Sequence, residues 1–246
     1  MRIARILVAA FAVASLAGPL AAQTKRSPDQ VYEQAMTHWR AASWYSHLRD
    51  PNITAIEIDT LRTTWQAVAD LPANERPSLY QKDPDWPQTL ANVSKLIDAA
   101  SDAADRNDGQ ATEADLAQIG DRLAAARRRA GMSGFSDAVR RYQAAVDHLS
   151  SLVTFAEQRQ GAAFDDARRA EVEQTTAVCA AAAVALEGAI PQPWAGDGKL
   201  KALIQQNLDS IQALQKGLGQ HASGLAIAAA INVVRSNYWL LFLNYG

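Results

Sequence analysis

The chain has 246 residues, of which 48% are hydrophobic and 20% charged, with a formal net charge of −2. This length and balance are ordinary for a soluble globular protein with one large or two smaller cores. The absence of a strong basic balance argues against nucleic acid as a partner.

Residues 1–22 predict a cleaved secretory signal. Arg2 and Arg5 precede an apolar run over residues 6–17, and small residues follow Gly18-Pro19. This order is typical of a signal peptide, whereas a retained membrane anchor is the alternative. An apolar stretch that crosses a bilayer usually needs about 20 residues. We therefore expect a periplasmic or secreted protein with no stable membrane span after cleavage.

The remaining chain predicts an all-α fold, because helical periodicity and capping signals recur and no strand pattern stands out. Ser27-Pro28-Asp29-Gln30, for example, is a capping-box start for the first helix. The predicted helices cover approximately residues 28–49, 54–71, 87–106, 112–130, 136–160, 165–190, 198–218 and 222–243.

Two proline-rich connections, residues 72–87 and 191–198, each divide a set of four predicted helices at its midpoint. Each contains a tryptophan beside proline, Trp86 and Trp194, separated by 108 residues. This correspondence predicts a tandem duplication of antiparallel four-helix bundles. The expected domains are residues 23–132 and 133–246, and one fused eight-helix domain is the alternative.

The sequence contains no pattern that identifies catalytic residues or a metal site. His38, His47, His148 and His221 lack the Glu-x-x-His spacing of bundle metal sites. The single Cys179 lies in an apolar helix and is expected to be a small core residue. We predict no catalytic residue, no metal and no cofactor, with an enzyme that uses a carboxylate cluster as an alternative.

Aromatic residues are concentrated in the first half and provide the candidate binding residues. Trp39 and Trp65 lie on the inward stripes of neighbouring predicted helices, where core packing is one interpretation. Other aromatic residues lie near the end of the first helix and in the long connection. If a ligand pocket exists between helices, the sequence places it among Trp39, Trp44, Tyr45, Trp65 and Trp86.

The last predicted helix is apolar on more than one face, which is one feature of a membrane span. Polar residues interrupt it at the centre, including Asn232 and Arg235. These residues favour a buried helix or a dimer contact instead. A homodimer is therefore an alternative to a monomer.

The export signal, the helix order and the loop placement resemble the cytochrome c′ family of periplasmic four-helix bundles. In that family a Cys-x-x-Cys-His motif on the fourth helix attaches haem. Here the corresponding stretches read Leu123-Ala124-Ala125-Ala126-Arg127 and Ile231-Asn232-Val233-Val234-Arg235, and Tyr238 takes the place of a later aromatic residue. The resemblance implies the bundle architecture, but these residues cannot form thioethers or supply a histidine ligand.

The predicted function is therefore that of an exported, haem-free helical-bundle protein for binding or scaffolding. It would serve an unidentified protein partner or an apolar small ligand, as an accessory to a redox or envelope complex. Non-covalent haem ligated by Met36 or His38, or binding of another small ligand, is the alternative.

Overall fold

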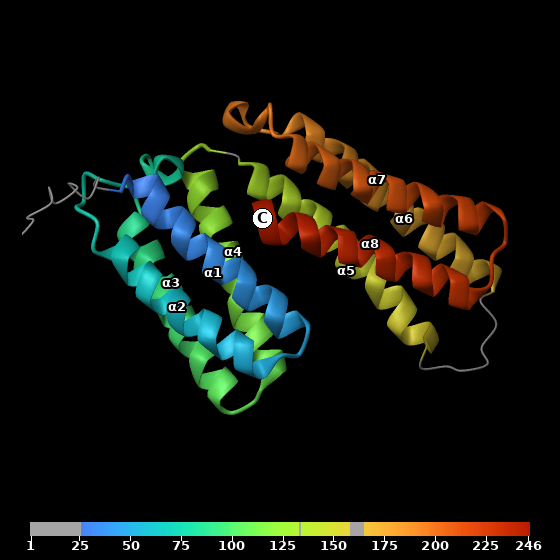
Figure 1. Ribbon diagram of the computed structural model, residues 1–246, viewed down its shortest axis with the longest axis horizontal. Helices are drawn as coiled ribbons and strands as arrows, with labels where there is room; N and C mark the ends of the chain where they lie inside the picture. Colours follow the sequence, from blue (N-terminus) through green and yellow to red (C-terminus); the bar gives the residue numbers. More distant parts are fainter. Residues whose placement is uncertain (1–25, 133, 158–164) are drawn as a thin grey trace, which may run out of the picture.

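The computed structural model describes residues 26–132, 134–157 and 165–246, and all of its regular structure within those ranges is helical (Figure 1). The predicted all-α fold class is therefore confirmed. The predicted signal, residues 1–22, lies outside the described residues. The α-helices are α1 (Pro28–His47), α2 (Pro51–Ala69), α3 (Trp86–Asp105), α4 (Gly109–Arg129), α5 (Phe135–Glu157), α6 (Asp166–Gly188), α7 (Gly198–Gly219) and α8 (Gly224–Tyr245). The 3-10 turns η1 (Ser78–Tyr80) and η2 (Gln192–Trp194) lie in the two proline-rich connections.

Helices α2 and α4 each begin three residues ahead of their predicted starts, because aspartates cap them. The carboxylates of Asp50 and Asp108 each accept the backbone N–H three residues later, at 3.1 Å. Pro51 is therefore the first residue of α2, a position that suits proline because it needs no N–H donor there. The capping box at Ser27 forms as predicted.

Four helices end on a residue with left-handed backbone geometry. Arg49, Asn107 and His221 have φ of 59°, 56° and 53°, and Gly131 has φ of 70°. After each, the next N–H donates to the carbonyl five residues earlier. This Schellman motif satisfies carbonyls that a helix end otherwise leaves unpaired.

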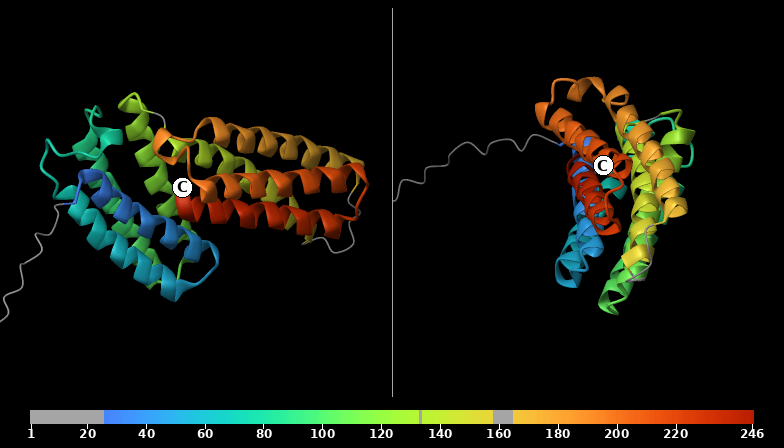
Figure 2. Two further views of the ribbon diagram at one scale, coloured as in Figure 1. Left: turned by 45° about the horizontal axis from the view of Figure 1, so that its top comes forward. Right: turned by 90° about the vertical axis from the view of Figure 1, so that its right-hand side faces the viewer.

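The helices form two sets, each of which closes on itself. In the first set α1 contacts α2, α2 contacts α3, α3 contacts α4, and α4 contacts α1. In the second set α5, α6, α7 and α8 contact one another in the same cyclic order. The sets lie side by side with their axes inclined (Figures 1 and 2). Helices α1 and α8 join them, and we call this junction the seam.

Apolar side chains at helical spacing fill the interior of each set. In the first, Ile58, Leu61 and Trp65 of α2 are fully buried. Cys179 of α6 is buried, as predicted, and burial raises the pKa of its thiol to about 12. The thiol is therefore an unreactive core group at neutral pH.

Helix α8 is long and apolar enough to cross a membrane by length and composition, but half of its most apolar window is buried inside the molecule. Its buried face includes Ile231, Val234 and Tyr238, whereas Leu225 and Val233 are exposed. The predicted burial of this helix is thus present on one face.

Candidate functional site

A cavity of about 800 Å³ lies at the seam between the two sets of helices. Residues of α1, η1 and α4 form one wall, and residues of α5, the connection after α6 and the end of α8 form the other. We call it the seam cavity. Its volume falls within the range of about 300–1,000 Å³ that is usual for small-molecule sites.

Aromatic side chains from both sets line the seam cavity. Trp39 is fixed by an indole N–H that donates to the carbonyl of Leu116 at 2.9 Å. On the opposite wall Trp194 packs edge-on against Phe135 and Tyr245, with ring centroids 6.0 and 5.6 Å apart. These rings form apolar walls that are held in place before any ligand arrives.

A buried polar network adjoins the cavity, which two of its members, Tyr32 and Arg127, line. The guanidinium of Arg127 donates through Nη2 to Asp137 at 2.7 Å and through Nη1 to the hydroxyl of Tyr80 at 2.9 Å. The Tyr80 and Tyr32 hydroxyls are 2.7 Å apart. Burial raises the pKa of both tyrosines, so both are neutral at physiological pH. The network therefore offers neutral hydroxyls next to a permanently charged cation.

The balance of charge on this network favours the ionised form of both partners in the salt bridge. Burial alone would lower the pKa of Arg127, but Tyr80 and Asp137 outweigh burial and raise it. Burial alone would raise the pKa of Asp137, but hydrogen bonds from Arg127 and the N–H of Gly134 lower it. Because Arg127 belongs to α4 and Asp137 to α5, this ion pair ties the two sets together.

A second arginine at the cavity is incompletely paired. Arg40 is 5% exposed, and its Nη atoms donate to the carbonyl of Gly246 at 3.0 Å and to Glu33 at 2.5 Å. Its Nε is buried and has no hydrogen-bond partner among the described residues. An uncompensated donor of this kind is costly, and it recurs at sites that await a ligand or an ordered water.

A more polar hollow of about 510 Å³ lies on the other side of Trp39, lined from α1, α4, α5 and α8. We call it the seam groove. His47 lies 3.4 Å from Glu113 through Nδ1 and contacts Arg235 through Nε2. Because arginine only donates, Nε2 accepts, which places the single imidazole proton on Nδ1 toward Glu113. His47 also stacks on Trp239, with ring centroids 4.5 Å apart.

Three acidic side chains line the seam groove, and two of them face cations. Glu113 lies 3.5 Å from the guanidinium of Arg49, and Asp121 pairs with Arg140. The hydrogen bond with His47 also lowers the pKa of Glu113. Although the side chain of Asp147 is exposed in the groove, the surrounding protein raises its pKa by desolvation. This is the feature closest to the carboxylate cluster that the enzyme alternative requires.

The five predicted pocket residues do not gather at one site. Trp39 lines both seam hollows, and the other four line neither. Trp44 packs on Trp239, with centroids 5.4 Å apart, and Tyr45 is half-buried. Trp65 and Trp86 are buried and pack edge-on at 6.4 Å inside the first set.

Trp86 differs from its predicted place in the long connection, because it is the first residue of α3 and stacks on Tyr80 at 4.4 Å. Arg127, in the last turn of α4, is 4% exposed and paired with Asp137. The sequence contained no signal for this partnership, because Asp137 belongs to the next helix.

The positions that correspond to the cytochrome c′ motif lie at or beside the seam. Leu123 and Arg127 line the seam cavity, and Arg235 lines the seam groove. Met36, one of the two proposed haem ligands, also lines the cavity. His38, the other, bonds Glu57 at 2.8 Å and does not line the cavity.

Among the described residues, no group of three or more His, Cys, Asp or Glu side chains is arranged to hold a metal ion. The polar residues that line the seam cavity are arginines, tyrosines, serines, an asparagine and two carboxylates. No family model, curated protein or solved structure matches this chain.

Proposed function

We propose that this chain is an exported ligand-binding protein built from two tandem, antiparallel, cytochrome c′-like four-helix bundles without covalent haem. The cyclic contacts within each set of helices support the bundle interpretation. The ligand is a small molecule with an apolar body and a polar group, and it binds in the seam cavity. The carrying observation is a cavity of about 800 Å³ that is lined by aromatic side chains from both sets and by Arg127.

The chemistry of the walls defines this ligand class. Trp39, Phe135 and Trp194 supply apolar surface, which provides most of the binding energy for small ligands. The hydroxyl of Tyr32 and the guanidinium of Arg40 supply a few fixed polar atoms, which orient a ligand. Both sets of helices contribute to the cavity, so neither set alone would form the site.

Binding of the uncharged apolar dye N-phenyl-1-naphthylamine tests this proposal. We expect saturable enhancement of dye fluorescence, and we expect Ala189→Trp, which places an indole in the cavity, to weaken binding about tenfold or more. Ala213→Trp is the matched control, since Ala213 is exposed on α7 and lines neither seam hollow. Equal binding by wild type and Ala189→Trp would exclude the seam cavity as the dye site.

Non-covalent haem is the second candidate, favoured by the place of Met36 in the cavity wall. A haemin titration followed by visible absorption distinguishes the two. A Soret band that shifts in Met36→Leu but not in Met132→Leu would favour haem, whereas unchanged free-haemin absorption would remove it. Met132 also lines the cavity and is more exposed, so the pair controls for nonspecific contact.

A further inference from the structure

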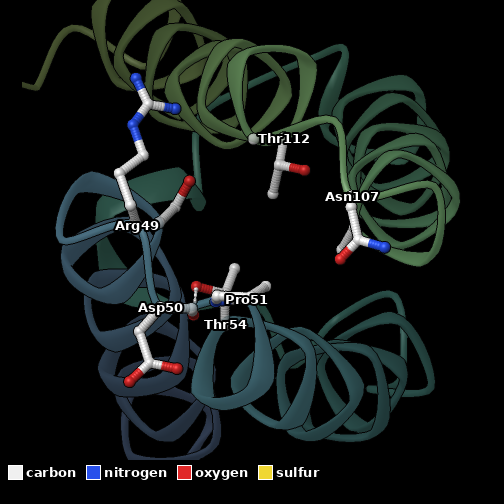
Figure 3. A pocket seen from close by; sticks show the side chains of 9 residues that line it. Arg49, Asp50, Pro51, Thr54, Asn107 and Thr112 are labelled. Carbon is white, nitrogen blue, oxygen red and sulfur yellow. Dashed lines mark hydrogen bonds between the residues drawn. The ribbon is translucent and has the colours of Figure 1, made fainter.

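A third pocket lies at the far end of the first set of helices, between two turns of the same design. Residues 46–54 span the end of α1, a three-residue turn and the start of α2, and residues 104–112 span the corresponding turn between α3 and α4. In each, a left-handed residue, Arg49 or Asn107, is followed by a capping aspartate. The two turns lie on opposite sides of the pocket (Figure 3). We call this space the end pocket.

The end pocket exists because small side chains form the last core layer. Ser46, Thr54, Ala104 and Thr112 line its floor, one from each of the four helices. One turn deeper, the same helix faces carry large residues such as Ile58 and Leu116, which are fully buried. The space left is about 270 Å³.

The floor contains one polar group that the protein leaves unpaired. The hydroxyls of Thr54 and Thr112 donate to the carbonyls of their capping aspartates at 2.6 and 2.8 Å. Ser46 is 4% exposed, and within the part of the chain that the structure describes its Oγ has no hydrogen-bond partner. The corresponding residue of the other turn is Ala104, so only one wall offers this hydroxyl.

The mouth of the end pocket carries a cation. Arg49 extends from the end of α1 along the edge of the pocket toward α4 (Figure 3). One of its Nη atoms lies across Gly109, where a Cβ would approach it to 3.0 Å, and the other is 3.5 Å from Glu113. The Arg49 side chain is 63% exposed, so much of it remains accessible.

The acidic side chain among the lining residues, Asp50, is turned away from the pocket (Figure 3). The side chain of Asp50 points outward (Figure 3), and its carboxylate accepts the N–H of Ile53. The N-termini of α2 and α4 both begin at the mouth, and helix N-termini favour negative charge. The mouth therefore combines a guanidinium with two helix N-termini, while the floor offers methyl groups and one unpaired hydroxyl.

We propose that the end pocket binds a small monocarboxylate with a compact apolar body, at a site separate from the seam cavity. The carboxylate pairs with Arg49 at the mouth, the body packs against Pro51 and Ala104, and the far edge of the ligand approaches Ser46. A protein cavity of about 150 Å³ is known to admit benzene, so about 270 Å³ accommodates a ring with a carboxylate.

Benzoate and its uncharged counterpart benzyl alcohol test the proposal in two-dimensional ¹H–¹⁵N NMR titrations of the full chain. We expect benzoate to bind with a dissociation constant of about 1 mM or tighter, and benzyl alcohol to bind about tenfold more weakly. The shifts should centre on residues 46–54 and 104–112.

Two variants that make the α1–α2 turn resemble the α3–α4 turn separate the contributions of the Arg49 charge and the Ser46 hydroxyl to binding. Arg49→Asn copies the residue at 107, tolerates the left-handed backbone, and removes the charge. It should weaken benzoate about tenfold and leave benzyl alcohol unchanged. Ser46→Ala copies residue 104 and should leave benzoate nearly unchanged, because the ring edge that faces Ser46 has no hydrogen-bonding atom; it should weaken 4-hydroxybenzoate, whose hydroxyl can pair with the Ser46 Oγ, by about threefold to tenfold.

Ala104→Leu fills the pocket and should abolish the localised shifts, whereas Ala189→Trp at the seam cavity should leave them intact. Absence of saturable benzoate binding in a folded wild-type protein would overturn the proposal. It would equally be overturned if Ala104→Leu bound benzoate as well as wild type, or if Arg49→Asn weakened both ligands alike. These outcomes are independent of dye binding at the seam.

Discussion

The two sets of helices differ in which polar groups they bury. The first set buries the charged residues Arg40, Asp83 and Arg127, whereas the described part of the second set buries polar residues but no charged one. Its core instead contains Asn207, whose amide oxygen accepts the hydroxyl of Tyr142 at 2.9 Å. The buried charges therefore belong to the first set, whereas the second set buries the neutral amides of Asn207 and Asn237.

The positions of the buried charges explain this difference. Arg127 crosses the seam to Asp137, and Asp83 holds the long connection against α4 through two hydrogen bonds of 2.9 Å from Arg129. Loops and seams bury less apolar surface than a helix interface, so directional groups specify their geometry. Inside the second set, helix packing already provides the attraction, and the amide network has only to satisfy its own polar atoms.

The largest effect is expected from breaking the charge pair across the seam. Arg127→Met should lower the free energy of unfolding by about 3–5 kcal/mol, because it leaves Asp137 largely buried without its cation. Urea unfolding followed by circular dichroism measures this change. The double variant Arg127→Met/Asp137→Leu should recover much of the loss, and a single-variant loss below about 1 kcal/mol would contradict the role of the pair.

A smaller loss of stability is expected when the hydrogen bonds of Asn207 in the second set are removed. Asn207→Leu should lower the free energy of unfolding by about 1–3 kcal/mol, because the Tyr142 hydroxyl and the Asn237 carbonyl lose their partner. Adding Tyr142→Phe should recover part of the loss in the same urea assay. If Asn207→Leu proved as damaging as Arg127→Met, the contrast between charged and neutral burial would fail.

The helix caps should not distinguish the two sets. Asp50→Ala in the first and Asp165→Ala in the second each remove one hydrogen bond to a helix N-terminus. Each should lower the free energy of unfolding by about 1 kcal/mol, measured by thermal unfolding. A loss at Asp50 well above that at Asp165 would show that the α1–α2 turn has a role beyond capping.

The smallest expected effect is a change in how the stability of the seam depends on acidic pH. Because the folded-state pKa of Asp137 lies below its ordinary value, its contribution is complete above about pH 4 and is lost as the pH falls through the folded pKa. Asp137→Asn should therefore flatten the fall in stability below pH 4, measured by urea midpoints across pH. Asp197→Asn provides the comparison within the second set, since hydrogen bonding from Tyr245 also lowers the pKa of Asp197, but away from the Arg127 pair.

The sequence predicted the helices well because their signals are local. Capping residues, prolines and apolar spacing place all eight helices within a few residues of their observed ends. The largest shifts came from Asp50 and Asp108, which were not recognised as caps.

The sites were less predictable, because they are made by residues far apart in the chain. Trp39, one of the predicted pocket residues, lines the seam cavity, but its cavity partners Phe135 and Trp194 come from the other set of helices. Tyr80 and Asp137 meet Arg127 only after three separate segments have packed. The periodicity of one helix cannot predict contacts between separate segments. The end pocket is equally hard to predict, because it depends on small side chains at the ends of four different helices.

The left-handed helix ends have a consequence for engineering. Only Gly131, of the four, is the residue type that adopts this geometry without strain. His221 is exposed and ends α7, away from both seam hollows and the end pocket. Left-handed geometry in a residue with a Cβ carries a penalty of about 1 kcal/mol or more. We therefore expect His221→Gly to raise the thermal stability without changing the seam hollows or the end pocket.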